Sequence, residues 1–512
     1  MEKILWADDE IDLLKPHIMF LKAKGYDVVT ANNGRDAIDA LAHEPFDLVL
    51  LDENMPGISG LETLTLINQQ FPQLPVIMIT KSEEENLMNQ AIGNKISDYL
   101  IKPVNPNQIL LSIKKNLHSS ELVAQQASTS YQQEFQRLSS LISRAETIDD
   151  FYELYRQLVY WEMNLATTET HMDEMLAMQT RDANYNFTKF VKQNYEDWVN
   201  TPEHPLMSHE LFKRRVFPML DAGEKVFFIL IDNFRLDQWR ALQPLISEFF
   251  NVSEDLYTTI LPTSTQYARN AIFAGLMPLQ IATMYPGLWV DEDENEGKNI
   301  YEEQLIRTQI ERFRRHDTFS YAKLNDSTAI EKYLARFKQL TPNQLNVVVL
   351  NFIDMLSHAR TESKMIRELA NSDAAYCSLT ESWLRHSGAI DLFRRIAESG
   401  FKIVLTTDHG TIRVDNPIKV IGDRNTNTNL RYKVGKSLNY NRKQVYEMTN
   451  PKHFGLPAPN LSSTFIYACN EDFFSYPNNY NYYVQYYTGT FQHGGISLQE
   501  MLVPLVTLTP KQ

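Results

Sequence analysis

Carboxylate and imidazole side chains follow several apolar runs in the second half of the chain. The runs VFFILI, NVVVLNFI and FKIVLTT are nearly continuous in apolar residues, which is typical of strands buried on both faces. Carboxylates and imidazoles together suit Zn²⁺, with Mn²⁺ or Fe as alternatives. These residue types therefore predict a metal site. The candidate ligands are Asp232, Asp354, His358, Asp408, His409 and His493.

The spacing of these side chains predicts two ions. Asp354 and His358 are four positions apart, so on a helical turn they point the same way. Asp408 and His409 stand at the mouth of a predicted strand and can serve another ion. His493 precedes two glycines, which permit a sharp turn beside a site. Two ions roughly 3.5–4 Å apart clamp the attacking and leaving oxygens of a phosphoryl group, so we expect metal-assisted phosphoryl chemistry.

The stretch LPTSTQYARNAIFAG, which begins at Leu261, holds three hydroxyl residues in a row where helix capping needs one. A threonine placed between two metal ions becomes a nucleophile without a neighbouring histidine as base. We therefore predict that one hydroxyl among Thr263, Ser264 and Thr265 faces the metals while another caps the helix. The N-terminus of that helix also favours an anionic phosphate.

A second set of reactive side chains stands at the ends of short apolar runs near the N-terminus. In parallel α/β sheets, ligands bind beyond the carboxyl ends of the strands. Carboxylates there hold Mg²⁺, and one carboxylate can accept a phosphoryl group to give an aspartyl phosphate. A lysine and a hydroxyl then bind the phosphoryl oxygens. The residues that make up this predicted phosphoacceptor site are Asp8, Asp9, Asp52, Thr80 and Lys102.

Three segments that differ in sequence pattern must position these two sites. Residues 1–118 alternate short apolar runs with amphipathic ones, which predicts parallel βα units. The same alternation returns over residues 216–512, with longer loops. The fold class we predict is α/β multidomain.

The middle segment, residues 119–215, is predicted to be an all-α helical bundle. No glycine occurs between Gly93 and Gly223, and no proline occurs between Pro106 and Pro202. Leu, Gln, Glu, Met and Tyr recur at three- and four-residue steps, as helices require. We expect a long helix to continue from the first segment into this bundle.

Composition places the chain among ordinary globular proteins and excludes some functions. The 512 residues are 43% hydrophobic and 22% charged, and two to four domains are expected. Two cysteines make no disulfide framework, and neither a signal peptide nor a long apolar run is present, so we expect a cytoplasmic protein without membrane insertion. The net charge of −15 argues against binding to duplex DNA.

The first segment resembles response-regulator receiver domains through ADDE, LLDENMPGISG, ITKSEEE and DYLIKPV. The resemblance implies a flavodoxin-like fold with a parallel five-stranded sheet, phosphorylation of Asp52 by a sensor histidine kinase, and a homodimer on phosphorylation. Lys102 would bind the phosphate, and Thr80 and Tyr99 would be the switch residues. A plain aromatic core residue is the other explanation for Tyr99. The implied Mg²⁺ ligands are Asp8, Asp9, Asp52 and the Asn54 carbonyl.

The last segment resembles the alkaline phosphatase superfamily in its PglZ branch, through IDNFRLDQW and TTDHG. The resemblance covers about residues 220–512 and implies a di-zinc phosphodiesterase. Thr265 would be the nucleophile, because superfamily members place it ten residues before a glycine like the one in this register. No third metal set is visible, and Arg235 and Arg269 are only candidates for the phosphate-clamping arginine. These two departures from the superfamily pattern favour diesters over monoesters.

The resemblance also implies how the ligands divide between the two zinc ions. The first ion would be bound by Asp232, Thr265, Asp408 and His409. The second ion would be bound by Asp354, His358 and His493.

Taken over its whole length, the chain resembles the PorX-type response regulators of type IX secretion. This resemblance implies a phosphorylation-controlled enzyme that acts on a nucleotide-type phosphodiester and regulates type IX secretion. The alternative is a non-catalytic signalling adaptor that binds a sigma factor of the ECF class or a secretion component. The metal site would then be structural, or would bind a ligand without turnover.

Overall fold

A computed structural model describes most of the chain. The described residues are 2–81, 96–166, 172–291, 297–362, 372–422, 426–458, 460 and 462–511, and the side chains of 119–125 and 358–362 lie outside the description. The chain divides into two compact units, Met1–Thr129 and Ser130–Gln512. Further division of the second unit near residue 215 stays a prediction.

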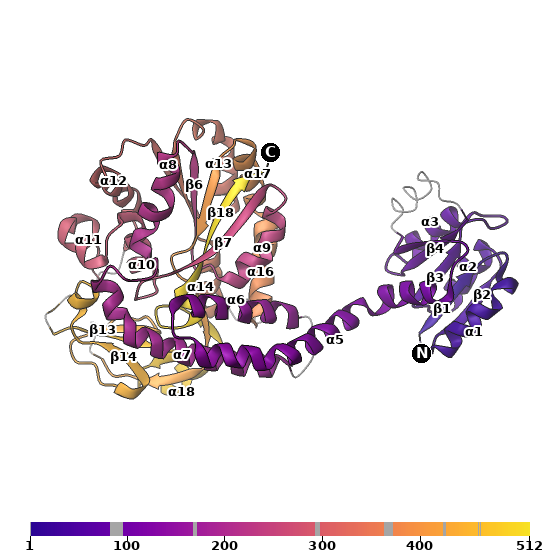
Figure 1. Ribbon diagram of the computed structural model, residues 1–512, viewed down its shortest axis with the longest axis horizontal. Helices are drawn as coiled ribbons and strands as arrows, with labels where there is room; N and C mark the ends of the chain where they lie inside the picture. The colour runs from indigo at the N-terminus through magenta and orange to yellow at the C-terminus, as the bar shows by residue number, and fades with distance from the viewer. Residues whose placement is uncertain are drawn as a thin grey trace. The chain divides into compact units, whose positions relative to one another are not determined.

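The first unit contains a five-stranded parallel sheet in the order β2-β1-β3-β4-β5 (Figure 1). This confirms the predicted parallel five-stranded sheet. The strands are β1 (Lys3–Ala7), β2 (Asp27–Ala31), β3 (Leu48–Asp52), β4 (Val76–Thr80) and β5 (Asp98–Ile101). The helices are α1 (Lys15–Ala23), α2 (Gly34–His43), α3 (Gly60–Gln70) and the start of α5 (Pro106–Arg144).

Alternation along the central strands builds a core on each face of this sheet. Leu5 and Ala7 of β1 join one buried cluster, whereas Ile4 and Trp6 join the cluster on the other side. Side chains of a strand point alternately to opposite faces, so a strand that is apolar throughout is buried on both. Because the strands are parallel, their carboxyl ends meet at one edge of the sheet.

The second unit begins with the rest of α5, followed by α6 (Ile148–Leu165) and α7 (Met172–Asn200). Within α5 the backbone departs from helical geometry at His118. A capping box starts α6, in which the Thr147 hydroxyl accepts a hydrogen bond from the Asp150 amide at 3.3 Å. Buried aromatic side chains fill the space between the helices, and the Tyr131 hydroxyl donates to Gln179 at 2.7 Å. The predicted helical region is confirmed.

A six-stranded mixed sheet organises the remainder of the second unit, in the order β7-β18-β10-β6-β9-β8. Only β18 runs antiparallel to its neighbours, β10 and β7, among the pairs in this sheet. Every residue of β6 is buried. The strands are β6 (Val226–Ile231), β7 (Phe250–Thr258), β8 (Phe319–Leu324), β9 (Leu345–Leu350), β10 (Lys402–Thr406) and β18 (Leu502–Pro510).

Helices cover both faces of this sheet, as the predicted α/β class requires. Figure 1 shows α8, α10 and α12 on one side, and α9, α16 and α17 on the other. Their bounds, with those of the neighbouring helices, are α8 (Phe217–Asp221), α9 (Leu236–Ile246), α10 (Thr265–Ala274), α11 (Pro278–Met284), α12 (Glu302–Arg312), α13 (Ser327–Ala335), α14 (Phe352–Glu362), α16 (Asp373–His386) and α17 (Ala389–Glu398).

Short strands pair beyond the main sheet. β11 (Ile412–Val414) pairs antiparallel with β17 (Thr490–Gln492), and β12 (Asn416–Lys419) pairs parallel with β16 (Asp472–Ser475). A three-stranded antiparallel sheet and two further helices complete this part: β13 (Tyr432–Gly435), β14 (Val445–Met448), β15 (Thr464–Ala468), α18 (Tyr480–Tyr487) and α19 (Leu498–Met501). Among the described residues, no helix combines the length and apolar character needed to cross a bilayer.

Arg431 and Glu500 form an ion pair whose two side chains are wholly buried, with Nη2 and Oε2 2.6 Å apart. Breaking a buried pair leaves a carboxylate without its cation, so we expect Arg431→Met to lower the free energy of unfolding by about 3–5 kcal/mol. Urea denaturation followed by circular dichroism measures the loss. The control is Arg137→Met in the exposed Arg137–Glu134 pair, where about 0.2–1 kcal/mol is expected. Equal losses in the two variants would contradict the expectation.

Candidate metal centre and phosphoacceptor site

Parallel pairing of three strands brings the candidate ligands to one edge of the mixed sheet. β6 pairs with β10 on one side and with β9 on the other. Asp232 directly follows β6, and its amide donates to the carbonyl of Leu350, the last residue of β9. Asp408 lies two residues beyond the end of β10. Carboxyl ends of parallel strands share an edge, so these side chains meet although they are far apart in sequence.

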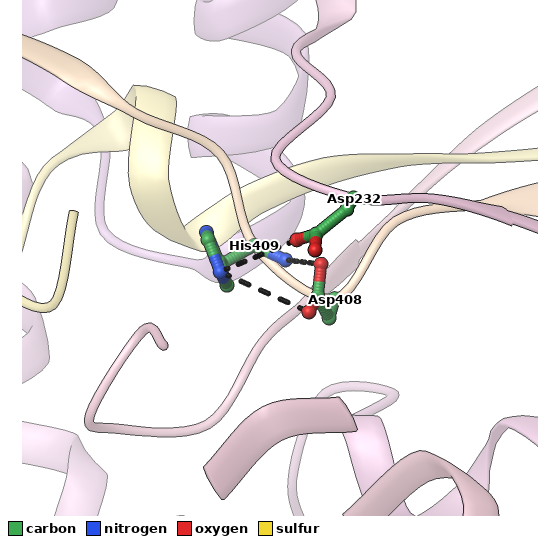
Figure 2. Close-up of side chains that lie close together, drawn as sticks. All are labelled: Asp232, Asp408 and His409. Carbon is green, nitrogen blue, oxygen red and sulfur yellow. Dashed lines mark hydrogen bonds and ion pairs between the residues drawn. The ribbon is translucent and has the colours of Figure 1, made fainter. Parts of the chain in front are cut away.

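Asp232, Asp408 and His409 form a buried cluster in which one ligand atom from each lies within 4.8 Å of the others (Figure 2). The Nε2 atom of His409 is 3.9 Å from Asp232 Oδ1 and 3.8 Å from Asp408 Oδ2. Thr265, the first residue of α10, places its hydroxyl 3.1 Å from the same Nε2 and 3.5 Å from Asp232 Oδ1. The structure therefore brings together all four ligands predicted for the first zinc ion.

A second group adjoins the first. His493 Nε2 lies 3.8 Å from Asp354 Oδ1. The His493 ring stacks on that of His409, with 4.1 Å between centroids. Asn233 donates from its side chain to Asp354 at 3.4 Å. The side chain of His358, the remaining predicted ligand of the second ion, lies outside the described residues.

Backbone carbonyls orient both histidines for metal binding. Nδ1 of His409 is 3.0 Å from the Gly410 carbonyl, and Nδ1 of His493 is 3.1 Å from the Thr263 carbonyl. A carbonyl only accepts hydrogen bonds, so each Nδ1 donates to it, which makes Nε2 the candidate ligand atom of each ring. Both Nε2 atoms face carboxylates. A second nitrogen held by the backbone is the usual setting of a metal-ligating histidine.

The pKa values of the two buried carboxylates, Asp232 and Asp408, are shifted in opposite directions. Burial raises the pKa of Asp232 above its ordinary value, and neighbouring Asp408 adds to the rise, although Arg269 opposes it. Burial acts on Asp408 as well, but Arg269 and His409 outweigh it and hold the pKa of Asp408 below its ordinary value. A divalent cation between the two carboxylates would keep both ionised.

The residues present fit a zinc ion by their chemistry. Two carboxylates, an unprotonated imidazole nitrogen and a hydroxyl are a donor set that suits Zn²⁺, and also Mn²⁺ or Fe. The side-chain carbonyl of Asn233 is buried there without a hydrogen-bond partner among the described residues. A buried acceptor left without a donor is costly unless a ligand satisfies it.

The phosphoacceptor site lies at the carboxyl edge of the five-stranded sheet. Asp8, Asp9 and Asp52 form the second carboxylate cluster with metal-binding geometry among the described residues. Lys102 Nζ bridges two of them, at 2.8 Å from Asp8 Oδ2 and 2.7 Å from Asp52 Oδ1. Burial raises the pKa of Asp52, and the hydrogen bond from Lys102 opposes this rise. The arrangement offers Mg²⁺ carboxylate oxygens and holds a lysine beside the candidate phosphoacceptor.

The remaining predicted receiver residues are Thr80, Tyr99 and Asn54. Thr80 is buried and its hydroxyl donates to Glu53. Tyr99 of β5 packs against one of the two cores of this sheet, and burial raises its pKa. Asn54 is exposed two positions beyond Asp52. The switch and ligand roles of these residues stay predictions.

Comparison with known families identifies the large domain. Residues 211–508 match the BREX system PglZ alkaline phosphatase-like domain, which is more than half of the chain. The chain belongs to the PglZ alkaline phosphatase-like family. Residues 4–114 match the response regulator receiver domain, and residues 121–199 match the PorX response regulator linker domain. Receiver, linker and PglZ domain in this order are the architecture of PorX-type response regulators, which confirms the resemblance noted in the sequence.

Curated relatives share only part of the chain. It is 30% identical over 156 residues to the alkaline phosphatase synthesis transcriptional regulatory protein PhoP of Bacillus subtilis, covering 30% of this chain and 63% of that protein. It is 38% identical over 122 residues to the transcriptional regulatory protein CpxR homolog of Haemophilus influenzae, covering 23% of this chain and 52% of that protein. The chain thus spans less than two thirds of the length of these relatives.

Solved structures also match over a limited share. A receiver domain protein of Methanospirillum hungatei is 28% identical and covers 23% of this chain and 95% of its own, with a TM-score of 0.23. Response regulator TrrA of Thermotoga maritima, in complex with Mg(2+)-BeF, is 31% identical and covers 23% of this chain and 100% of its own, with a TM-score of 0.22. TM-scores this low carry no argument about the whole chain.

These matches establish two general properties. The receiver domain implies a phosphodonor such as a histidine kinase. The alkaline phosphatase-like PglZ domain suggests a metal-dependent phosphoesterase.

The prediction that a hydroxyl of the PTST stretch caps α10 is wrong. Ser264 is the N-cap residue, but its hydroxyl makes no capping bond and is buried without a partner among the described residues. Thr263 donates instead to the Gly495 carbonyl at 2.9 Å and accepts from the Gly494 amide at 3.0 Å. The Thr263 hydroxyl is therefore bonded to the loop after His493 and does not cap the helix.

Neither candidate arginine of the PglZ domain is placed as a phosphate clamp. Arg235 is buried in ion pairs with Asp237 and Asp373. Arg269 is buried among Asp232, Asp408 and Glu302. Sequence reasoning missed the contact of Arg269 with the metal ligands, although its position four residues after Thr265 on one helix was an available signal.

Removal of either carboxylate should reduce zinc binding. We expect Asp232→Asn and Asp408→Asn each to lose zinc, because an amide replaces a charged oxygen donor. Zinc per chain is measured by mass spectrometry of the metal after dialysis of the full-length protein. Asp326→Asn, at the exposed N-cap of α13, is the control and should keep its zinc. Full zinc content in both site variants would contradict the assignment.

Proposed function

We propose that this chain is a response regulator whose PglZ domain hydrolyses phosphodiesters at a two-zinc centre, with Thr265 as nucleophile. The observation that carries the proposal is the position of the Thr265 hydroxyl, 3.1 Å from His409 Nε2 and 3.5 Å from Asp232 Oδ1 at the start of α10. A threonine that served only to begin a helix would not need to face buried acidic and imidazole side chains.

The residues of the site divide the reaction between them. When bound, zinc supplies Lewis-acid stabilisation of phosphoryl oxygens and favours ionisation of a hydroxyl. The N-terminus of α10 directs its positive end toward an anionic phosphate. Thr265 Oγ1 attacks phosphorus while its hydroxyl proton passes to solvent, the P–O bond to the leaving alkoxide breaks, and the alkoxide takes a proton from solvent to depart as an alcohol. Water then hydrolyses the phosphodiester formed on Thr265, which releases a phosphomonoester and restores the hydroxyl.

The charges of the site favour a diester over a monoester. A monoester carries more negative charge on its phosphoryl oxygens and calls for an additional cation. Arg235 and Arg269 are each tied to carboxylates, so neither is offered to a substrate. A nucleotide-type diester is the substrate class we propose, in keeping with the resemblance to PorX-type regulators.

Phosphorylation of Asp52 is the proposed control. Lys102 already lies 2.7 Å from the carboxylate that would carry the phosphoryl group. We propose a sensor histidine kinase as donor, homodimerisation of the phosphorylated form, and regulation of type IX secretion from the cytoplasm as the biological output.

The nucleophile is tested with bis(p-nitrophenyl) phosphate as substrate and zinc-loaded full-length protein. We expect Thr265→Ala to lower kcat/KM on the order of 10³-fold or more, because the variant lacks the hydroxyl that contacts His409 and Asp232. Thr283→Ala, on an exposed face of α11, should behave as wild type. Zinc retained with no turnover even in the wild type would favour the adaptor alternative, in which the centre binds without catalysis.

The receiver switch is tested by sedimentation with and without beryllium fluoride and Mg²⁺. We expect the wild-type protein to double its mass with the phosphoryl mimic and Asp52→Asn to stay a monomer, because the amide cannot hold the mimic. Asp12→Asn, an exposed acid that pairs with Lys15 at 2.9 Å, is the control and should dimerise. An unchanged wild-type mass would refute the dimerisation step.

A further inference from the structure

Arg269 lies at the centre of a buried cluster of charges behind the metal centre. Its side chain has no exposed surface. Its three nitrogens are directed to three different carboxylates. Nη2 pairs with Asp232, Nε donates to Asp408 at 3.0 Å, and Nη1 donates to Glu302 at 3.3 Å. This one guanidinium therefore joins both carboxylates of the first zinc site to a third acid outside it.

The two oxygens of Asp232 have separate partners. Oδ2 pairs with Arg269, whereas Oδ1 faces the Thr265 hydroxyl at 3.5 Å and His409 Nε2 at 3.9 Å. On the other carboxylate, Arg269 holds Oδ2 of Asp408, which lies 3.8 Å from the same imidazole nitrogen. Pairing with Arg269 thus fixes which oxygens of the two carboxylates face the hydroxyl and the imidazole.

α10 presents the nucleophile and the arginine together. Thr265 and Arg269 are four residues apart on this helix, so they lie on one face of it. A shift of the carboxylates relative to Thr265 would therefore also strain their contacts with Arg269.

Glu302 anchors the far side of the guanidinium. It is 1% exposed, lies in the first turn of α12, accepts a hydrogen bond from the Tyr321 hydroxyl, and is 3.5 Å from Lys323 Nζ. Arg269 also donates to the Asn351 side chain at 3.4 Å, just before α14. The arginine is consequently held by α12 and by the segment that leads to Asp354.

We propose that Arg269 is a positioning residue that holds Asp232 and Asp408 in the geometry that binds zinc beside Thr265. The planar guanidinium offers donors in a rigid fork, which spans several carboxylates at once, whereas a lysine is a single point of charge. Arg269 therefore contributes a fixed arrangement of hydrogen-bond donors as well as a positive charge. This inference rests on the metal centre proposed above.

The test compares Arg269→Lys with the wild type in a two-step zinc titration against a chromogenic chelator, using the full chain. Lysine keeps the positive charge but cannot reach three carboxylates. We expect one zinc-binding step to weaken about 10–100-fold, as changes behind a metal ligand usually do. We also expect the visible spectrum of the cobalt(II)-loaded variant to change, because its band intensities depend on ligand geometry.

A matched control separates this role from general loss of packing. Arg240 donates to Glu254 from two nitrogens, at 2.9 and 3.3 Å, away from the metal centre. Arg240→Lys should lose stability but keep the wild-type zinc affinity and cobalt spectrum. If Arg269→Lys does not fold, Glu302→Gln serves instead, since it weakens the anchor of the arginine at constant shape and should weaken the same zinc step.

Two results would overturn the inference. One is wild-type zinc affinity together with a wild-type cobalt spectrum in Arg269→Lys, or in Glu302→Gln if that variant is the one that folds. The other is tighter zinc binding in Arg269→Met, which would show that the arginine only competes with the cation. A wild-type protein that binds no zinc would instead refute the metal centre itself.

Discussion

The structure of the PglZ domain must accommodate two carboxylates that are buried side by side. Asp232 and Asp408 end up next to each other because β6 and β10 are adjacent parallel strands. Charged carboxylates are costly to bury unless cations or hydrogen-bond donors surround them. Arg269, the Asn233 amide and the His409 amide provide part of that compensation. The proposed metal ion would supply the remaining positive charge, which would link the stability of this edge to its proposed chemistry.

The helices before the PglZ domain contribute directly to the position of Thr265, the proposed nucleophile. The Tyr195 hydroxyl of α7 accepts a hydrogen bond from the Leu261 amide at 2.7 Å, four residues before Thr265. Asn184 of the same helix accepts from the Leu498 amide at 2.8 Å, near the loop that carries His493. α7 is therefore part of the structure that shapes the site, and a change in its packing would reach both sides of the metal centre.

The receiver and the PglZ domain use the same physical arrangement for different ends. In each, carboxylates follow buried parallel strands and a cation-bearing side chain lies among them: Lys102 in the receiver and Arg269 in the PglZ domain. Lys102 is a single charged atom near the edge, at 11% side-chain exposure, so a phosphoryl group can reach it. Arg269 is fully enclosed and can act only on its protein neighbours. Exposure thus separates Lys102, the cation proposed to bind a phosphoryl group, from Arg269, the cation proposed to hold the ligands of a metal.

The amino-acid sequence alone is enough to predict the fold classes and the types of reactive side chain at the strand ends. Apolar runs ending in acids, and a long stretch without glycine or proline, were sufficient for the parallel sheets and the helical region. The roles of the individual site residues stay predictions. The partner of each polar atom, by contrast, depends on the three-dimensional packing of the chain. Thr263 ties down the His493 loop and does not cap α10, and Arg269 holds carboxylates and does not clamp phosphate. The reason is physical: a run of residues specifies burial and periodicity locally, whereas a hydrogen bond across 230 positions depends on how distant segments pack.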